Sequence, residues 1–448
     1  MRRPLAIAAG LLLCLAKLAQ PQEPARIPVD TFSLANGLRV ILSEDHSSQV
    51  VTVDLWYDVG SRNEVRGRTG FAHLFEHLMF QGSAHVKKGE HFQLVERAGG
   101  ELNGTTAEDR TAYYEMLPSN RLNLGLWLEA DRMRSLAVTD STFENQRQAV
   151  KEERRLRVDN QPYSAAIFEG MYLLQDSTEC FPYAHSVIGS MADLDSAKTG
   201  DVKAFFDLYY APNNATLVVA GDFTPAEAKA LIQQYFGDIP RGKDPPPVTC
   251  EAWRRGRQIR RPWPDDKATL PAVLYAYRAP EYRHADYPAL ELLANILGQG
   301  ESSRINQSVV RERRLAQTAF VLMNPAAPRR GPGVLLALAI ANQGISPDSI
   351  EEALGGEAAR VAREGVSEAE LTKAKNSYRA DVISRRQISF YMAEAIQNAA
   401  LFGGDPGGVN SDLARHVAVT AEDIKRVAAQ YLTPDNALVL LITPRSTR

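Results

Sequence analysis

The chain has 448 residues, of which 44% are hydrophobic and 23% are charged, and its formal net charge is −3. This length exceeds one typical domain, so we expect two or more. The composition is that of a folded globular protein and excludes the disordered and fibrous classes. Acidic and basic residues are mixed along the chain, so nothing in the charge pattern indicates a nucleic-acid partner.

Residues 1–20 have the build of a secretory signal peptide. Arg2 and Arg3 precede an apolar run over residues 5–16, which is too short to span a membrane comfortably. An uncleaved apolar anchor is the alternative, and the large Leu13 before Cys14 argues against a lipoprotein site. We expect a periplasmic or secreted protein without a membrane span in its mature form.

Cysteine use leaves one question open. After removal of the signal peptide only Cys180 and Cys250 remain. They could pair in an oxidising compartment, but two cysteines in so long a chain do not define a disulfide framework.

The first elements after the leader are strands. Residues 32–42 hold Asn36-Gly37 between two apolar runs, which predicts a hairpin, and residues 50–59 alternate as a strand. A loop over 60–70 then leads into an apolar helix over 70–80.

The apolar helix carries three ionisable residues, His73, Glu76 and His77. Their i, i+3, i+4 spacing places them on one face within one turn. A buried carboxylate between two imidazoles is costly unless something satisfies it, and a divalent metal held by both histidines would do so. H-x-x-E-H is the reverse of the H-E-x-x-H zinc motif, so Glu76 is the candidate general base.

Downstream, residues 91–98 predict a short helix, residues 101–116 a pair of strands at a sheet edge, and residues 122–136 a helix. The S-x-x-E sequence at 141–144 predicts a capping box that opens a helix to about residue 158. Phe143 and Val150 mark the inner face of that helix. Glu153 therefore points inward and Glu152 outward.

The second half of the chain repeats the first. Residues 201–219 and 423–441 share a helix, a turn and a strand at an offset of 222, and the strand at 272–277 is the counterpart of 52–57. Between the copies lies a segment rich in Pro, Arg and Lys. We therefore expect an N-terminal lobe over 28–240, a linker over 241–264 and a homologous C-terminal lobe over 265–448. The second copy has no metal motif.

Residues 70–82 resemble the inverzincin motif of the pitrilysin and mitochondrial-processing-peptidase family. In that family a second glutamate, about 76 residues beyond the motif, is the third zinc ligand, and Glu153 stands 76 residues beyond His77. Further matching segments are Gly99-Gly100 with Asn103, residues 182–189, residues 210–214 and residues 297–304.

The resemblance implies an α+β fold with two homologous lobes, each an antiparallel sheet covered by helices, which form half of a clamshell or all of it. It implies a zinc endopeptidase with one Zn²⁺ per chain, held by His73, His77 and Glu153, that acts on unfolded or short peptides. The strand at Asn103, Gly104 and Thr105 is then the edge to which an extended substrate adds. An ordinary protected sheet edge is the alternative for that strand.

The chain departs from the family pattern in one place. Active members carry an Arg and a Tyr in the far lobe that help to bind substrate and stabilise the oxyanion. Here the segment supplies Arg311, but Gln317 stands where Tyr is expected. Either the chain acts slowly alone, or it is the zinc-bearing subunit of a dimer whose homologous partner supplies the pair. A non-catalytic or weakly active peptide-binding clamp is the competing class of function.

Overall fold

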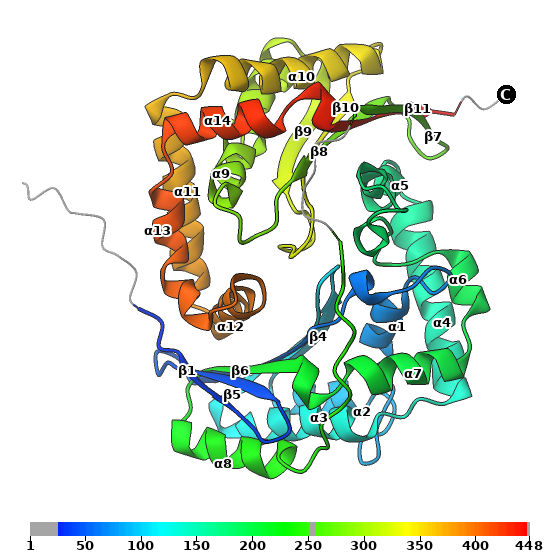
Figure 1. The fold of residues 1–448 in the computed structure, drawn as a ribbon, viewed down its shortest axis with the longest axis vertical. Coiled ribbons are helices and arrows are strands. Elements are labelled where there is room, and N and C mark those ends of the chain that lie inside the picture. The colour runs from blue at the N-terminus through cyan, green and yellow to red at the C-terminus, as the bar shows by residue number, and fades with distance from the viewer. Residues whose placement is uncertain (1–25, 251–256, 446–448) are drawn as a thin grey trace, which may run out of the picture.

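The computed structural model describes residues 26–250 and 257–445, which form two lobes that face one another (Figure 1). The first lobe is built on a six-stranded sheet in the order β1-β2-β6-β3-β5-β4. Its strands are β1 (Asp30–Ser33), β2 (Arg39–Glu44), β3 (Val50–Tyr57), β4 (Glu101–Thr106), β5 (Thr111–Pro118) and β6 (Ala215–Gly221). All neighbours are antiparallel except β2 and β6, and β1 with β2 forms the predicted hairpin.

Helices cover the outer face of this sheet, where the alternating residues of β3 are buried. The helices of the first half are α1 (Phe71–Leu78), α2 (Glu90–Arg97), α3 (Leu122–Ser135), α4 (Asp140–Arg154), α5 (Ser164–Phe168), α6 (Met191–Ser196), α7 (Thr199–Tyr209) and α8 (Pro225–Phe236). The side chains of Val51, Val53, Leu55 and Tyr57 lie in the core beneath them, because successive strand residues point to opposite faces.

The second lobe repeats this plan around the sheet β7-β11-β8-β10-β9. Its strands are β7 (Ile259–Asp265), β8 (Ala272–Ala279), β9 (Ala316–Met323), β10 (Gly333–Ala341) and β11 (Ala437–Pro444). Its helices are α9 (Tyr287–Gly298), α10 (Pro347–Glu364), α11 (Glu368–Arg385), α12 (Ser389–Asn398), α13 (Asp412–Val417) and α14 (Ala421–Tyr431). The predicted α+β fold of two related lobes is confirmed, with one parallel strand pair in each sheet.

The internal repeat extends to its hydrogen bonds. Asn214 donates its side-chain amide to Tyr209 O at 2.9 Å, where α7 ends. Asn436 donates in the same way to Tyr431 O at 2.7 Å, where α14 ends. One asparagine in each copy thus satisfies a carbonyl at a helix C-terminus, which has no partner within its own helix.

Each half sends one segment across to the sheet of the other. Helix α12 packs on the inner face of the first sheet, where Met392 and Ile396 belong to the same buried apolar cluster as Val218 (Figure 1). Conversely, residues 163–174 of the first half, which include α5, pack on the inner face of the second sheet. Neither sheet is therefore covered by its own half alone.

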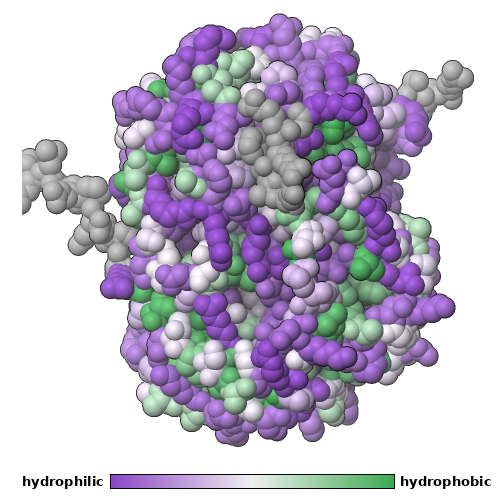
Figure 2. Space-filling model, viewed as in Figure 1, coloured by the Kyte–Doolittle hydropathy of each residue, from purple (hydrophilic) through white to green (hydrophobic). Residues whose placement is uncertain are grey.

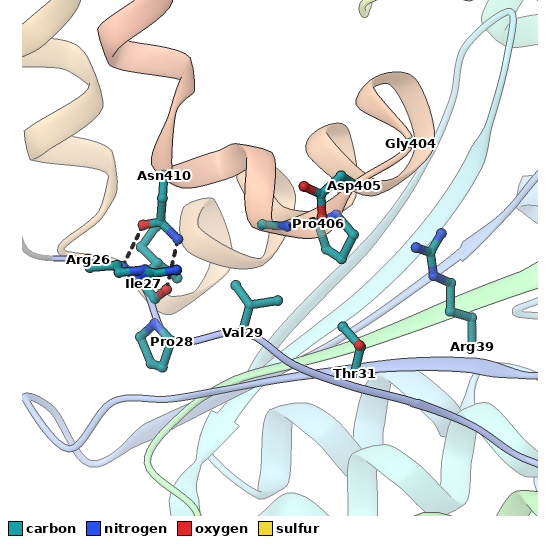
Figure 3. Close-up of a pocket in the computed structure, with 11 residues that line it drawn as sticks. Arg26, Ile27, Pro28, Val29, Thr31, Arg39, Gly404, Asp405, Pro406 and Asn410 are labelled. Carbon is teal, nitrogen blue, oxygen red and sulfur yellow. Dashed lines mark hydrogen bonds between the residues drawn. The ribbon is translucent and has the colours of Figure 1, made fainter.

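Polar contacts complete the seam between the halves. The buried Glu108 carboxylate, between β4 and β5, pairs with Arg329 and accepts a hydrogen bond from Tyr172. At the start of the described chain, the side-chain amide of Asn410 bonds both the N–H and the carbonyl of Ile27, beside a pocket shared by the two halves (Figure 3).

The predicted start of α4 is wrong by two residues. Thr139, not Ser141, is the N-cap, and its hydroxyl accepts from Thr142 N at 3.1 Å while Thr142 Oγ1 accepts from Thr139 N. Thr139 is extended, as an N-cap must be, so the reciprocal bond forms there and the helix begins at Asp140. The helix gives way to a π-helical turn over Arg155–Asp159, close to the predicted end.

Three other expectations concern the signal peptide, the linker and the two cysteines. The signal peptide and Cys14 lie outside the described residues. Strand β7 begins at Ile259, inside the segment expected to be linker, because it pairs in parallel with β11. Cys180 and Cys250 form a disulfide, which answers the question that the sequence left open.

The surface seen in Figure 2 is mostly hydrophilic, with apolar residues in small scattered areas. Among residues 26–250 and 257–445, no helix combines the length and the hydrophobicity that a bilayer crossing requires.

Candidate metal and catalytic site

Helix α1 carries the three motif residues and is anchored by its other face. Phe71, Leu74 and Phe75 are buried in the core of the first lobe. The i, i+3, i+4 spacing then leaves His73, Glu76 and His77 on the opposite side, as predicted. Gly70 precedes the helix with φ +89°, a conformation that a glycine adopts without strain.

Helix α4 brings Glu153 to the two histidines. Glu153 Oε2 lies 3.1 Å from His77 Nε2 and 3.6 Å from His73 Nε2. The ligand atoms of the three residues all lie within 4.8 Å of one another. The neighbouring Glu152 points away: its side chain is 56% exposed, against 19% for Glu153. The structure thus brings together the three residues predicted to hold a metal.

The electrostatics of the cluster suit metal binding. Burial, with a contribution from the nearby His77, lowers the pKa of His73 to about 4, so the ring is neutral at physiological pH. The hydrogen bond from His77 lowers the pKa of Glu153, which favours the carboxylate. A neutral imidazole and an ionised carboxylate are the forms that coordinate cations.

Glu76 lies beside the edge strand β4 and has its own partner. Thr106 Oγ1 donates to Glu76 Oε2 at 2.7 Å. Burial raises the pKa of Glu76, although the Thr106 hydrogen bond and His77 oppose the shift. The raised pKa moves the carboxyl towards the range in which a general base works near neutral pH.

Strand β4 approaches the helix closely because residue 104 is glycine. A Cβ on Gly104 would lie 3.0 Å from Glu76 Cγ and 3.2 Å from Phe80 Cε2, tighter than ordinary contacts. Asn103 and Thr105 point to the other face and are exposed. Among the described residues β4 pairs with β5 alone, so its outer edge is the end of the sheet.

The two predicted residues of the far lobe belong to the second half of the chain. Arg311 is on the π-helical segment Asn306–Glu312, where its exposed side chain pairs with Glu301. Gln317 is the second residue of β9, the edge strand of the other sheet, and is exposed. Within the described chain, neither residue has a hydrogen bond or ion pair with the cluster on α1.

Sequence reasoning missed three residues around the site: Thr106, Glu64 and His185. Glu64 accepts hydrogen bonds from the first turn of α1 and contacts His185. No local spacing relates residue 185 to residue 64, so this contact could not be predicted. Thr106 directly follows the predicted edge segment, and strand alternation could have indicated that it faces α1 as Gly104 does.

A second buried group, His91, Glu115 and Glu129, also has ligand atoms close together. The guanidinium of Arg132 already pairs with both carboxylates. Burial, and then the charge of Arg132, lower the pKa of His91 to about 3. This cluster therefore has an internal cation and is a structural ion-pair network.

Comparison with known proteins gives the family. A family model described as insulinase (peptidase family M16) matches residues 39–189, and one described as the peptidase M16 inactive domain matches residues 196–378. The zinc protease PqqE of Helicobacter pylori is 30% identical over 93% of both chains. A probable mitochondrial-processing peptidase subunit beta of Arabidopsis thaliana is 23% identical over 92% of this chain and 78% of its own length.

Solved structures give the same result. The crystal structure of a protease from Helicobacter pylori superposes with a TM-score of 0.88 and 29% identity, covering 93% of this chain and 100% of that one. Pitrilysin superposes with a TM-score of 0.72 and 19% identity, over 95% of this chain and 46% of its own length, a likeness of fold. The resemblance predicted from the motif is confirmed: the chain belongs to peptidase family M16, of the insulinase-like superfamily.

Proposed function

We propose that the chain is a zinc-dependent endopeptidase that binds one Zn²⁺ and hydrolyses unfolded or short peptides. The observation that carries this proposal is the convergence of His73, His77 and Glu153 beside Glu76. Two imidazoles and one carboxylate are a donor set of catalytic zinc sites, in which the fourth position is left to water. The Helicobacter pylori relative is named a zinc protease, which supports the same metal.

The residues around that site have separable roles in the proposed reaction. Zinc, when bound, would lower the pKa of a water molecule and polarise the scissile carbonyl. The Glu76 carboxylate accepts the proton of the attacking water and returns it to the leaving nitrogen. Thr106 holds that carboxylate through its 2.7 Å hydrogen bond, which fixes the oxygen that faces the water.

Substrate binding is assigned to the outer edge of β4. An extended peptide adds there as a strand, so main-chain hydrogen bonds hold it whatever its sequence. The main-chain N–H and C=O groups for this pairing come from Asn103, Gly104 and Thr105. Because Gly104 has no side chain, β4 lies close to Glu76, and a strand added to β4 is held near that carboxylate.

Zinc content and peptide hydrolysis test the proposal in matched variants. We expect Glu153→Gln to lose zinc, whereas Glu152→Gln, the exposed neighbour, keeps both zinc and activity. Glu76→Gln should keep one zinc per chain and lose activity by about 10²–10⁴-fold. Full activity in Glu76→Gln would show that the assigned mechanism is wrong.

We further propose that the chain works in a dimer, as the zinc-bearing subunit beside a homologous chain that supplies an Arg/Tyr pair, or beside a second copy. Gln317 supports the heterodimer, because the loss of one oxyanion donor typically costs about 10²–10³ in kcat and a partner with the Arg/Tyr pair would restore it. The test is peptide turnover by the purified chain alone and with the homologous chain. Equal turnover in the two samples would contradict the heterodimer.

A non-catalytic or weakly active peptide clamp is the second candidate. It is favoured by the match of residues 196–378 to the M16 inactive domain and by the lack of the motif on α9. Peptide binding without hydrolysis by zinc-loaded protein, alone and in the dimer, would select it. A periplasmic or secreted location is proposed for either function, supported by the Cys180–Cys250 disulfide.

A further inference from the structure

The first turn of α1 is capped from outside the helix. Its N-cap is Gly70, which has no side chain to accept the free N–H groups of the first turn. Glu64, six residues earlier, does this instead: Oε2 accepts from Gly70 N and Oε1 accepts from Ala72 N, both at 2.8 Å. Ala72 is the residue directly before the candidate ligand His73.

Glu64 is itself held by His185. The Glu64 side chain is 0% exposed, and His185 Nε2 lies 3.1 Å from Glu64 Oε2 and 3.0 Å from Ser61 O. His185 Nδ1 lies 2.9 Å from Phe181 O. All three partners are acceptors, so both ring nitrogens donate and the ring is the cation that a buried carboxylate requires.

The segment that carries His185 also reaches the second metal-bearing helix. Gly189 packs directly on Gly70, where a Cβ on Gly189 would collide with Gly70 Cα. The carbonyl of the same Gly189 accepts from Arg154 Nη1 at 2.6 Å, and Arg154 is the residue after Glu153 on α4. Residues 185–189 therefore contact both helices that carry the three candidate ligands.

We propose that Glu64 and His185 are positioning residues that set the geometry of α1 against α4 for metal binding; this rests on the zinc site proposed above. The carboxylate fixes the first turn of α1 through two hydrogen bonds, and the imidazolium fixes the carboxylate. Neither residue reaches the metal or the substrate. Their effect is on how well His73 and His77 are placed to share a cation with Glu153.

The test compares zinc affinity in Glu64→Gln, His185→Gln and a matched control. Glu370→Gln is the control, because Glu370 also accepts from a helix N-terminus, at Ser367 N, and also pairs with a cation, Arg304, but in the other lobe. Zinc affinity is measured by competition with a chromogenic chelator, and the thermal midpoint of each zinc-free protein is measured alongside.

We expect Glu64→Gln and His185→Gln to weaken zinc binding by about 10–100-fold, the range that is typical when residues that orient metal ligands are mutated. Glu370→Gln should bind zinc as the wild type does, even where its thermal midpoint falls by as much. Wild-type zinc affinity in Glu64→Gln would overturn the inference while leaving the zinc site intact. Absence of zinc binding by the wild type would instead overturn the proposed function itself.

Discussion

We expect the ion pair of Arg329 with Glu108 to contribute strongly to the stability of the contact between the two halves. Both side chains are 1% exposed, and Tyr172 donates a further hydrogen bond to the same carboxylate. Arg329→Met removes the cation and leaves a buried carboxylate with one neutral donor. Breaking a buried pair from one side typically costs about 3–5 kcal/mol, because the remaining charge keeps its desolvation penalty.

The controls separate this effect from the loss of an arginine. Arg363→Met removes a side chain that is 68% exposed in its pair with Glu364, and exposed pairs contribute about 0–1 kcal/mol. The double variant Glu108→Gln with Arg329→Met removes both charges. We expect it to be more stable than Arg329→Met alone, since Tyr172 still satisfies the neutral amide.

Calorimetric melting at pH 7 measures the effect. A loss of about 3–5 kcal/mol lowers the thermal midpoint of a unit the size of one lobe by roughly 6–20 °C. An Arg329→Met midpoint equal to that of Arg363→Met would refute the argument. The argument would also be refuted if the double variant lost as much stability as Arg329→Met and Glu108→Gln lose when their separate losses are added.

Three further outcomes are expected. Burial and the nearby Glu394 raise the pKa of Asp54 well above its ordinary value, so the folded state becomes less stable as pH rises and the unfolded chain ionises this group. Asp54→Asn should therefore raise the thermal midpoint more at pH 8 than at pH 5. An equal shift at the two pH values would contradict this. Burial alone would lower the pKa of His416, but the hydrogen bond to Glu291, the negative charges of Glu291 and Asp412 and the hydrogen bond to the Asp412 carbonyl together outweigh it and raise the pKa. The stability from this pair is thus complete below about pH 6.5 and lost as pH rises through the folded pKa, and His416→Asn should lower the thermal midpoint more at pH 6 than at pH 8. The disulfide joins residues 70 positions apart in the sequence and so restricts the unfolded chain. Cys250→Ser should lower the free energy of unfolding, measured in urea, by about 4 kcal/mol. An unchanged urea midpoint would show that Cys180 and Cys250 do not constrain the unfolded chain.

Much of the geometry of the candidate site could be predicted from the sequence, because it depends on local periodicity. The spacing of His73, Glu76 and His77 on a helix fixes their common face, and the same reasoning places Glu153 inward on α4. The 222-residue repeat predicts the second lobe because both copies keep the residues that end the helix and begin the strand.

The remainder depends on contacts between distant parts of the chain. The contacts from His185 to Glu64 and from Gly189 to Gly70 join segments more than 100 residues apart, which no local pattern encodes. The start of α4 was wrong because two hydroxyl residues, Thr139 and Ser141, both suit a cap, and only the backbone conformation selects Thr139. The predicted linker wrongly includes most of β7, because the pairing of β7 with β11 is also a long-range contact.

The exchange of α12 and residues 163–174 between the lobes has a consequence for how the protein assembles. The first sheet has its inner face covered only after residues near 400 have been synthesised, so an N-terminal fragment would expose the apolar surface that Met392 and Ile396 bury. Each half therefore needs a segment of the other half to cover the inner face of its sheet. A chain nicked at residues 241–249 should stay together as one particle even after the Cys180–Cys250 disulfide is reduced, whereas the two halves made separately should aggregate unless they are mixed during refolding.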